Sequence, residues 1–155
     1  MIEFKNVSKV YDNGSVALDD VCLTINDGEF VLICGHSGAG KSTLFKLLTH
    51  EVVPDAGTVI VDDFDVTRMK RSKIPKLRRK LGVVFQDFRL LPNKTVSENI
   101  AFALEVIEEK PKVIKEKVSH VLELVGLTDK ANDLPEDLSG GEQQRVALGR
   151  ALYSK

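Results

Sequence analysis

The chain has 155 residues, with 22 Lys and Arg against 23 Asp and Glu and a formal net charge of -1. Apolar residues make up 43% and charged residues 29%, which is ordinary for a globular domain and excludes a disordered tail, a collagen-like fibre or a disulfide scaffold. A nucleic-acid-binding protein usually carries a strong basic excess, so the near-neutral charge predicts no nucleic-acid partner.

The apolar runs and the cysteines of the chain predict its cellular compartment. No purely apolar run is longer than that of residues 30–34, which is far shorter than the ~20 residues that span a bilayer, and the N-terminus has no signal-peptide core. Cys22 and Cys34 each lie in an apolar, strand-like run. This favours two buried, reduced thiols over a disulfide or a metal pair, and predicts a protein that is cytosolic or lies on the cytosolic side of another structure.

Hydrophobic patterning predicts strands in the first half of the chain and helices in the second. The predicted strands cover residues 2–7, 16–25, 29–34, 58–61 and 81–85, and a helix is predicted over 41–49. The predicted strand at 29–34 is continuously apolar from residue 30 to 34, which is typical of a strand buried on both faces.

Two apolar stripes with helical spacing predict further helices near residues 96–107 and 114–125. Thr95 and Glu98 form a capping-box pattern at the start of the first, and Gly126 ends the second. The order of elements predicts an α/β core with a helical insertion from about residue 87 to 138.

A basic run without acidic residues lies between the predicted strands at 58–61 and 81–85. It consists of Arg68, Lys70, Arg71, Lys73, Lys76, Arg78, Arg79 and Lys80. Such a run suits either a solvated helix face or a surface that contacts anionic lipid headgroups or an acidic partner.

A phosphate-binding loop is predicted where the run at 29–34 meets the next helix. Residues 35–42 match the G-x-x-x-x-G-K-[ST] pattern, whose glycines let backbone N–H groups form an anion nest at a helix N-terminus. Lys41 would reach the β- and γ-phosphates, and the Ser42 hydroxyl would ligate Mg²⁺. His36 lies inside the loop, where its backbone would bind the phosphate, so we assign its side chain no catalytic role. The predicted nucleotide-binding residues of this segment are Gly35, His36, Ser37, Gly38, Ala39, Gly40, Lys41, Ser42 and Thr43.

A second glycine-containing helix start follows about a hundred residues later. The segment 138–145 reads Leu-Ser-Gly-Gly-Glu-Gln-Gln-Arg, and Ser139 and Glu142 form a capping-box pattern. Downstream of a phosphate loop, this segment resembles the signature of the ATP-binding-cassette (ABC) ATPases. The resemblance extends over all 155 residues.

The resemblance implies an α/β fold of the P-loop NTPase class in its ABC form. This fold is a mixed sheet core with N-terminal antiparallel strands and a helical subdomain, here incomplete at the C-terminus. It divides the chain into a nucleotide-binding core at 1–86, a helical subdomain at 87–138, and the signature with the start of its helix at 139–155.

The resemblance also assigns roles to individual residues. Tyr11 would stack on adenine, although read alone it suits an exposed loop tyrosine. Gln86 matches the glutamine loop of the family and would share the Mg²⁺ environment with Ser42, so Lys41 and Gln86 are the catalytic candidates. The signature residues would close over the ATP of a second subunit in an ATP-dependent homodimer; they are Ser139, Gly140, Gly141, Glu142 and Gln143.

In the family, the pattern continues with an apolar strand that ends in Asp-Glu and, later, with a His that senses the γ-phosphate. The pairs Glu108-Glu109 and Glu136-Asp137 do not follow predicted strands, and we reject both as substitutes. We therefore expect a fragment without a general base, in which the predicted strand at 29–34 would expose a hydrophobic edge.

Within the family, the phosphate loop, the basic run and residues 85–91 resemble the branch that acts in bacterial cell division. This implies a peripheral ATPase subunit on the cytoplasmic side of the plasma membrane, which uses Mg²⁺ with ATP and docks to a transmembrane partner near residues 86–105. The open alternatives are the ATPase of a lipoprotein- or macrolide-type exporter, a nucleotide-binding fragment without turnover, and a fragment that binds a membrane partner regardless of ATP.

Overall fold

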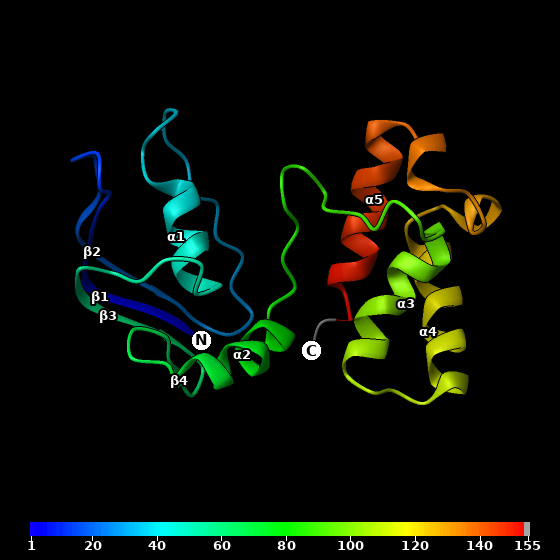
Figure 1. The fold of residues 1–155 in the computed structure, drawn as a ribbon, viewed down its shortest axis with the longest axis horizontal. Helices are drawn as coiled ribbons and strands as arrows, with labels where there is room; N and C mark the ends of the chain where they lie inside the picture. Colours follow the sequence, from blue (N-terminus) through cyan, green and yellow to red (C-terminus); the bar gives the residue numbers. More distant parts are fainter. Residues whose placement is uncertain (154–155) are drawn as a thin grey trace. The chain divides into compact units, whose positions relative to one another are not determined.

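The computed structural model divides into two compact units, Met1–Leu77 and Arg78–Lys155, each of which is described by itself (Figure 1). The structure describes residues 1–153. Residues 154 and 155, at the end of the predicted signature segment, lie outside the described residues.

The first unit is built on a four-stranded antiparallel sheet. Its strands are β1 (Ile2–Val10), β2 (Val16–Ile25), β3 (Ala56–Val61) and β4 (Phe64–Asp65), in the order β2-β1-β3-β4. Phe4 on β1 lies opposite Leu23 and Val59 on the neighbouring strands. Because opposed residues share a face of the sheet, this register gathers their side chains on the buried side. The predicted N-terminal antiparallel strands are confirmed.

Helix α1 (Lys41–Leu48) follows the phosphate-loop segment and contacts β3. Its apolar side buries Leu44 and Leu47, and the helix ends at Thr49, whose hydroxyl donates to the Phe45 carbonyl at 3.1 Å. The basic run then forms a short 3₁₀ turn, η1 (Arg71–Lys73), and helix α2 (Ile74–Lys80).

Two of the predicted strands are wrong. Residues 29–34 and 81–85 form no strand and pair with no other segment in the described part of the chain. Phe30 is 95% exposed and Leu32 is 76% exposed. An apolar run becomes a buried strand only when neighbouring strands accept its backbone hydrogen bonds, and hydrophobicity alone does not supply them.

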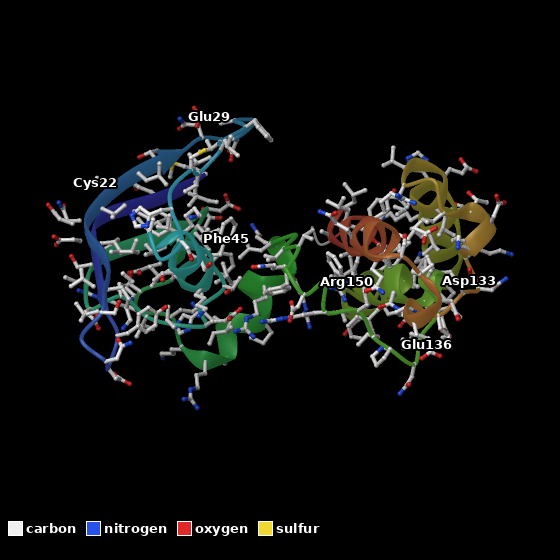
Figure 2. The ribbon with its side chains drawn as sticks, turned by 90° about the horizontal axis from the view of Figure 1, so that it is seen from above. Cys22, Glu29, Phe45, Asp133, Glu136 and Arg150 are labelled. Carbon is white, nitrogen blue, oxygen red and sulfur yellow. The ribbon has the colours of Figure 1, made fainter. Side chains whose placement is uncertain are left out.

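The expected burial of both cysteines is also wrong, because Cys22 and Cys34 are exposed. Cys22 lies on the edge strand β2 next to Leu23, so the alternation of the strand turns it away from the buried face (Figure 2). Cys34 lies in the segment that was expected to be a strand. Both thiols are free.

The second unit is helical and is held together by one apolar cluster. It contains α3 (Val96–Val106), α4 (Pro111–Leu124) and α5 (Gly140–Ala151), with short 3₁₀ turns η2 (Thr128–Lys130) and η3 (Pro135–Asp137) between α4 and α5. Helix α3 contacts both α4 and α5 (Figure 1). The buried cluster consists of Val96, Ile100, Leu104, Val118, Val121, Leu122, Leu127, Leu138 and Val146.

Local signals set the ends of these helices. The capping box of Thr95 and Glu98 opens α3 as predicted, and Gly126 has the left-handed φ of 65° just after α4. A Cβ at Gly149 would lie 2.7 Å from Val121 Cγ1, so this glycine lets α5 approach α4 closely. Among residues 1–153, every helix is too short or too polar to traverse a bilayer.

Candidate nucleotide-binding site

The phosphate-loop segment, residues 35–40, needs glycine at two positions. Gly38 and Gly40 have φ of 82° and 81°, in the left-handed region that glycine adopts without strain. A Cβ at Gly40 would lie 2.2 Å from the Ala17 carbonyl oxygen of β2, whereas a Cβ at Gly38 would meet open space. Gly40 is therefore required by both space and conformation, and Gly38 by conformation alone.

The Lys41 side chain folds back over this loop. Its ammonium group donates to the carbonyl oxygens of Gly35 and His36, at 2.6 and 2.7 Å. His36 Nδ1 lies 2.7 Å from the Ser37 carbonyl oxygen, so the imidazole rests against the backbone of its own loop. The positive charge of Lys41 thus already lies over the loop, where a bound phosphate would find it together with the N-terminus of α1.

The first turn of α1 orients Ser42 and Thr43 differently. Ser42 is exposed, which leaves its hydroxyl accessible to a ligand, whereas Thr43 is buried. Thr43 Oγ1 lies 3.2 Å from the Tyr11 hydroxyl, and the Lys46 ammonium lies 5.9 Å from the centre of the Tyr11 ring. Tyr11 is therefore half buried against α1, on the same unit as the loop. Its stacking on adenine stays a prediction.

This set of donors fits a magnesium-bound nucleotide. Backbone N–H groups and the Lys41 ammonium are donors for phosphate oxygens, and the Ser42 hydroxyl is an oxygen ligand of the kind that Mg²⁺ prefers. Mg²⁺ commonly uses only one or two protein ligands beside phosphates and water. The second predicted metal ligand, Gln86, belongs to the other unit, so its pairing with Ser42 stays a prediction.

Gln86 is exposed in a turn that is closed by a hydrogen bond from Phe88 N to Phe85 O, at 3.0 Å. The turn is reinforced by Arg89, whose guanidinium carbon lies 3.8 Å from the centre of the Phe85 ring. Phe88 and Arg89 both have left-handed φ values, of 55° and 46°, which non-glycine residues rarely adopt. A contact from outside this turn would stabilise two consecutive residues in the left-handed conformation.

Arg150 of α5, which is labelled in Figure 2, supplies that contact. Its guanidinium donates from Nη1 to the Arg89 carbonyl at 2.6 Å and from Nη2 to the Phe88 carbonyl at 2.7 Å. Burial lowers the pKa of this guanidinium, which nevertheless stays charged. Sequence reasoning missed Arg150. Its spacing was a usable signal. Arg150 follows Val146 and Ala147, which are apolar and buried, by four and three residues, and residues at this spacing share one face of a helix. The spacing therefore places the charge of Arg150 on the inner face of α5.

The signature segment opens α5 with the predicted capping box. Ser139 Oγ donates to Glu142 Oε2 at 2.6 Å, and the Ser139 backbone N–H donates to the same oxygen at 2.8 Å. These bonds to Ser139, with a smaller contribution from Lys130 at 3.4 Å, lower the pKa of Glu142 to about 2. Glu142 is therefore a carboxylate at neutral pH, and it caps the N-terminus of α5 together with Ser139.

The other signature residues divide between surface and interior. Gly140 and Gly141 are exposed, and a Cβ at either would meet open space. Gln143 turns inward and donates from Nε2 to the carbonyl oxygens of Pro135 and Leu138, at 3.0 and 3.2 Å. In this arrangement Ser139 and the two glycines form an accessible helix start, and Gln143 fixes the chain that leads into it.

Known proteins resemble this chain over nearly its whole length. A model of the ABC transporter family matches residues 18–155. Cell division ATP-binding protein FtsE of Bacillus subtilis is 53% identical over 154 residues, which are 99% of this chain and 68% of that protein. Methionine import ATP-binding protein MetN 1 of Bacillus thuringiensis is 47% identical over 155 residues, which are 98% of this chain and 46% of that protein.

A solved structure shows the same fold. The ATP-binding cassette MJ0796, a dimer bound to ADP and Pi, superposes with a TM-score of 0.90 at 37% identity, covering 99% of this chain and 70% of that one. The phosphate loop at the N-terminus of α1 and the capped start of α5 both lie within the residues that the family model matches. The chain belongs to the ABC transporter family of ATP-binding proteins.

Proposed function

We propose that this chain is the nucleotide-binding part of an FtsE-type subunit, which couples ATP binding and hydrolysis to a transmembrane partner in bacterial cell division. The observation that carries ATP binding is the loop geometry, in which Gly40 closes against β2 and the Lys41 ammonium lies over residues 35 and 36. The cell-division role is supported by the similarity to FtsE proteins of several bacteria, at 50 to 53% identity.

The residues of the first unit would bind the nucleotide. The loop N–H groups and Lys41 hold the phosphates, Ser42 contributes its hydroxyl to Mg²⁺, and Tyr11 contacts the adenine ring. Mg²⁺, when bound, would neutralise part of the phosphate charge. Lys41 must exchange its two carbonyl partners for phosphate oxygens, which are stronger acceptors because they carry negative charge.

The signature residues would act on the nucleotide of a second copy. Ser139, Gly140 and Gly141 present a helix N-terminus at the surface, and in a head-to-tail dimer that end would face the γ-phosphate. The MJ0796 cassette is described as a dimer with ADP and Pi. ATP then joins two subunits, and its hydrolysis releases them.

The partner would be a membrane protein of the FtsX type, docked near residues 86–105, with the chain peripheral on the cytoplasmic side of the membrane. A transport function is the second candidate, because a methionine-import ATPase is 47% identical to the chain. Purification from membranes separates these candidates. Recovery of an FtsX-type protein supports the cell-division role, and recovery of a transport permease instead contradicts it.

Nucleotide binding is tested by titrating the chain with a fluorescent ATP analogue in the presence of Mg²⁺. Lys41→Ala should weaken binding at least tenfold, because it removes the charged donor over the loop. Lys110→Ala, an exposed lysine of the second unit, should change nothing. Equal affinities of the two variants would contradict the proposed site.

Two further readouts address hydrolysis and dimerisation. Turnover that is lost in Lys41→Ala would identify a general base within the chain and overturn the expectation that residues 1–155 lack one. Binding without turnover would agree with that expectation. Ser139→Arg should leave nucleotide binding intact and abolish ATP-dependent dimers in size-exclusion chromatography; dimers that persist would contradict the head-to-tail arrangement.

A further inference from the structure

The basic run of residues 68–80 has no part in the proposed nucleotide site. It holds eight of the 22 Lys and Arg residues of the chain and none of the 23 Asp and Glu residues. The rest of the chain is therefore acidic on balance, although its overall charge is close to zero. Such segregation of charge concentrates a positive potential on one stretch of the surface.

All eight cationic side chains of the run are exposed. Five of them lie in the first unit, before and along η1 and α2: Arg68, Lys70, Arg71, Lys73 and Lys76. We call these five residues the basic surface. Within the described residues, no ion pair involves any of the five. Their charges are thus not taken up by ion pairs within the described residues.

The apolar residues of the same stretch do not form a docking patch beside these charges. Leu77 is buried, and Met69 and Ile74 are half buried. Specific protein interfaces usually combine a polar rim with an apolar centre, and nucleic-acid surfaces of this kind interleave aromatic residues for base stacking. The run contains no aromatic residue. These observations favour a partner that presents many anionic groups over an extended surface, and not a protein or nucleic acid that is recognised by apolar or aromatic contacts.

A hollow of about 410 Å³ next to the basic surface points the same way. Arg68, Lys70 and Lys73 line it, but so do Asp63 and Asp65. Asp65 Oδ1 accepts hydrogen bonds from the backbone N–H groups of Thr67 and Arg68, at 3.0 and 3.3 Å. The two carboxylates would repel a phosphate ion and make this hollow a poor site for one. We therefore assign the cations to an extended binding surface and not to a single anion site.

We propose that the basic surface binds the anionic headgroups of a phospholipid membrane directly, independently of nucleotide and of any protein partner. Clusters of four to eight Lys and Arg residues are attracted to anionic leaflets, and the attraction weakens as salt screens it. The inference goes beyond the proposed function, because it needs neither ATP nor a transmembrane subunit.

The test is sedimentation of the chain with vesicles of phosphatidylcholine, with and without phosphatidylglycerol. Binding should require phosphatidylglycerol and fall steeply with added salt. Replacing Lys70, Lys73 and Lys76 together by Gln should weaken binding on the order of a hundredfold, since each cation near an anionic membrane contributes about fivefold. Replacing Lys110, Lys112 and Lys115 by Gln is the matched control: these lysines are also exposed, and the net charge changes equally.

The outcomes are distinct. Equal loss in both triple variants would show that net charge alone matters and would overturn the proposal, as would equal binding to pure phosphatidylcholine. Tighter binding to a DNA duplex than to the anionic vesicles would overturn it in favour of a nucleic-acid surface. Circular dichroism of each variant confirms that its fold is intact. Lys41→Ala should bind vesicles like the unchanged chain, so failure of the nucleotide site and failure of the basic surface are told apart.

Discussion

At the scale of single residues, Arg150 is expected to contribute most to the order of the Gln86 segment. Its guanidinium forms two hydrogen bonds to the carbonyls of Phe88 and Arg89, the two residues with left-handed φ. Hydrogen bonds from a charged donor stabilise by about 1.5–3 kcal/mol. We expect Arg150→Ala to lower the free energy of unfolding by about 2 kcal/mol, measured by urea denaturation.

Arg145 provides the control on the same helix, because it is exposed. Arg145→Ala should change the free energy of unfolding by less than about 0.5 kcal/mol, as is usual for surface substitutions. Arg150→Lys should fall between the two alanine variants, since an ammonium keeps the charge but lacks the planar fork that reaches two carbonyls. If Arg150→Ala and Arg145→Ala unfold at the same urea concentration, the assigned role of Arg150 is wrong.

The contrast between Lys41 and Arg150 shows which site residues a sequence reveals. Lys41 belongs to a motif whose parts lie within eight consecutive positions, so its backbone partners Gly35 and His36 are local. Arg150 meets residues that are 61 and 62 positions away, and only the packing of α5 brings them together. Local contacts can be predicted from spacing, whereas contacts across the fold depend on packing that one sequence does not show.

At the scale of elements, the start of α5 should respond to acid. The pKa of Glu142 is lowered from 4.5 to about 2, first by its bonds to Ser139 and less by Lys130. A depressed carboxyl pKa stabilises the fold fully above pH 4.5 and progressively less as the pH falls toward 2. We expect Ser139→Ala to raise this pKa toward 4.5 and to reduce the acid dependence of stability.

The measurement is a carboxyl-carbon NMR titration of Glu142. Lys130→Gln should raise the pKa less than Ser139→Ala does, because the serine bonds are the larger cause. Glu98, whose pKa is lowered mainly by the backbone N–H of Thr95 in the other capping box, reports on each spectrum and should not change. A larger effect of Lys130→Gln would show that the ion pair, and not the capping box, controls this carboxylate.

The elements also differ in how well periodicity predicts them. Helices α1 and α3 match their predicted bounds to within about a residue, since both have helical apolar spacing, Gly40 of the phosphate loop precedes α1, and a capping box opens α3. Residues 29–34 and 81–85 have equally clear apolar patterns and are not strands. A helix satisfies its own backbone, whereas a strand needs a neighbour, so the same quality of pattern predicts helices more reliably.

At the scale of the whole molecule, the exposed segment 29–34, which is apolar from residue 30 onward, should govern self-association. Phe30, Val31 and Leu32 are 95%, 42% and 76% exposed. In the described structure, no backbone N–H of residues 30–34 donates to another backbone group. Exposed apolar side chains beside unpaired backbone groups are a template for pairing with another chain, so we expect reversible association that grows with protein concentration.

Leu32→Asp should weaken this association about tenfold or more, because burying one leucine contributes about 1.5–3 kcal/mol and 1.4 kcal/mol corresponds to a factor of ten. Leu124→Asp adds the same charge at an exposed leucine of α4, which is 64% exposed and lies outside the segment, and should change association little. Sedimentation equilibrium gives both constants. If the two variants weaken association equally, added charge is the cause and the segment is not the contact; if only Leu32→Asp weakens it, residues 29–34 form the self-association surface.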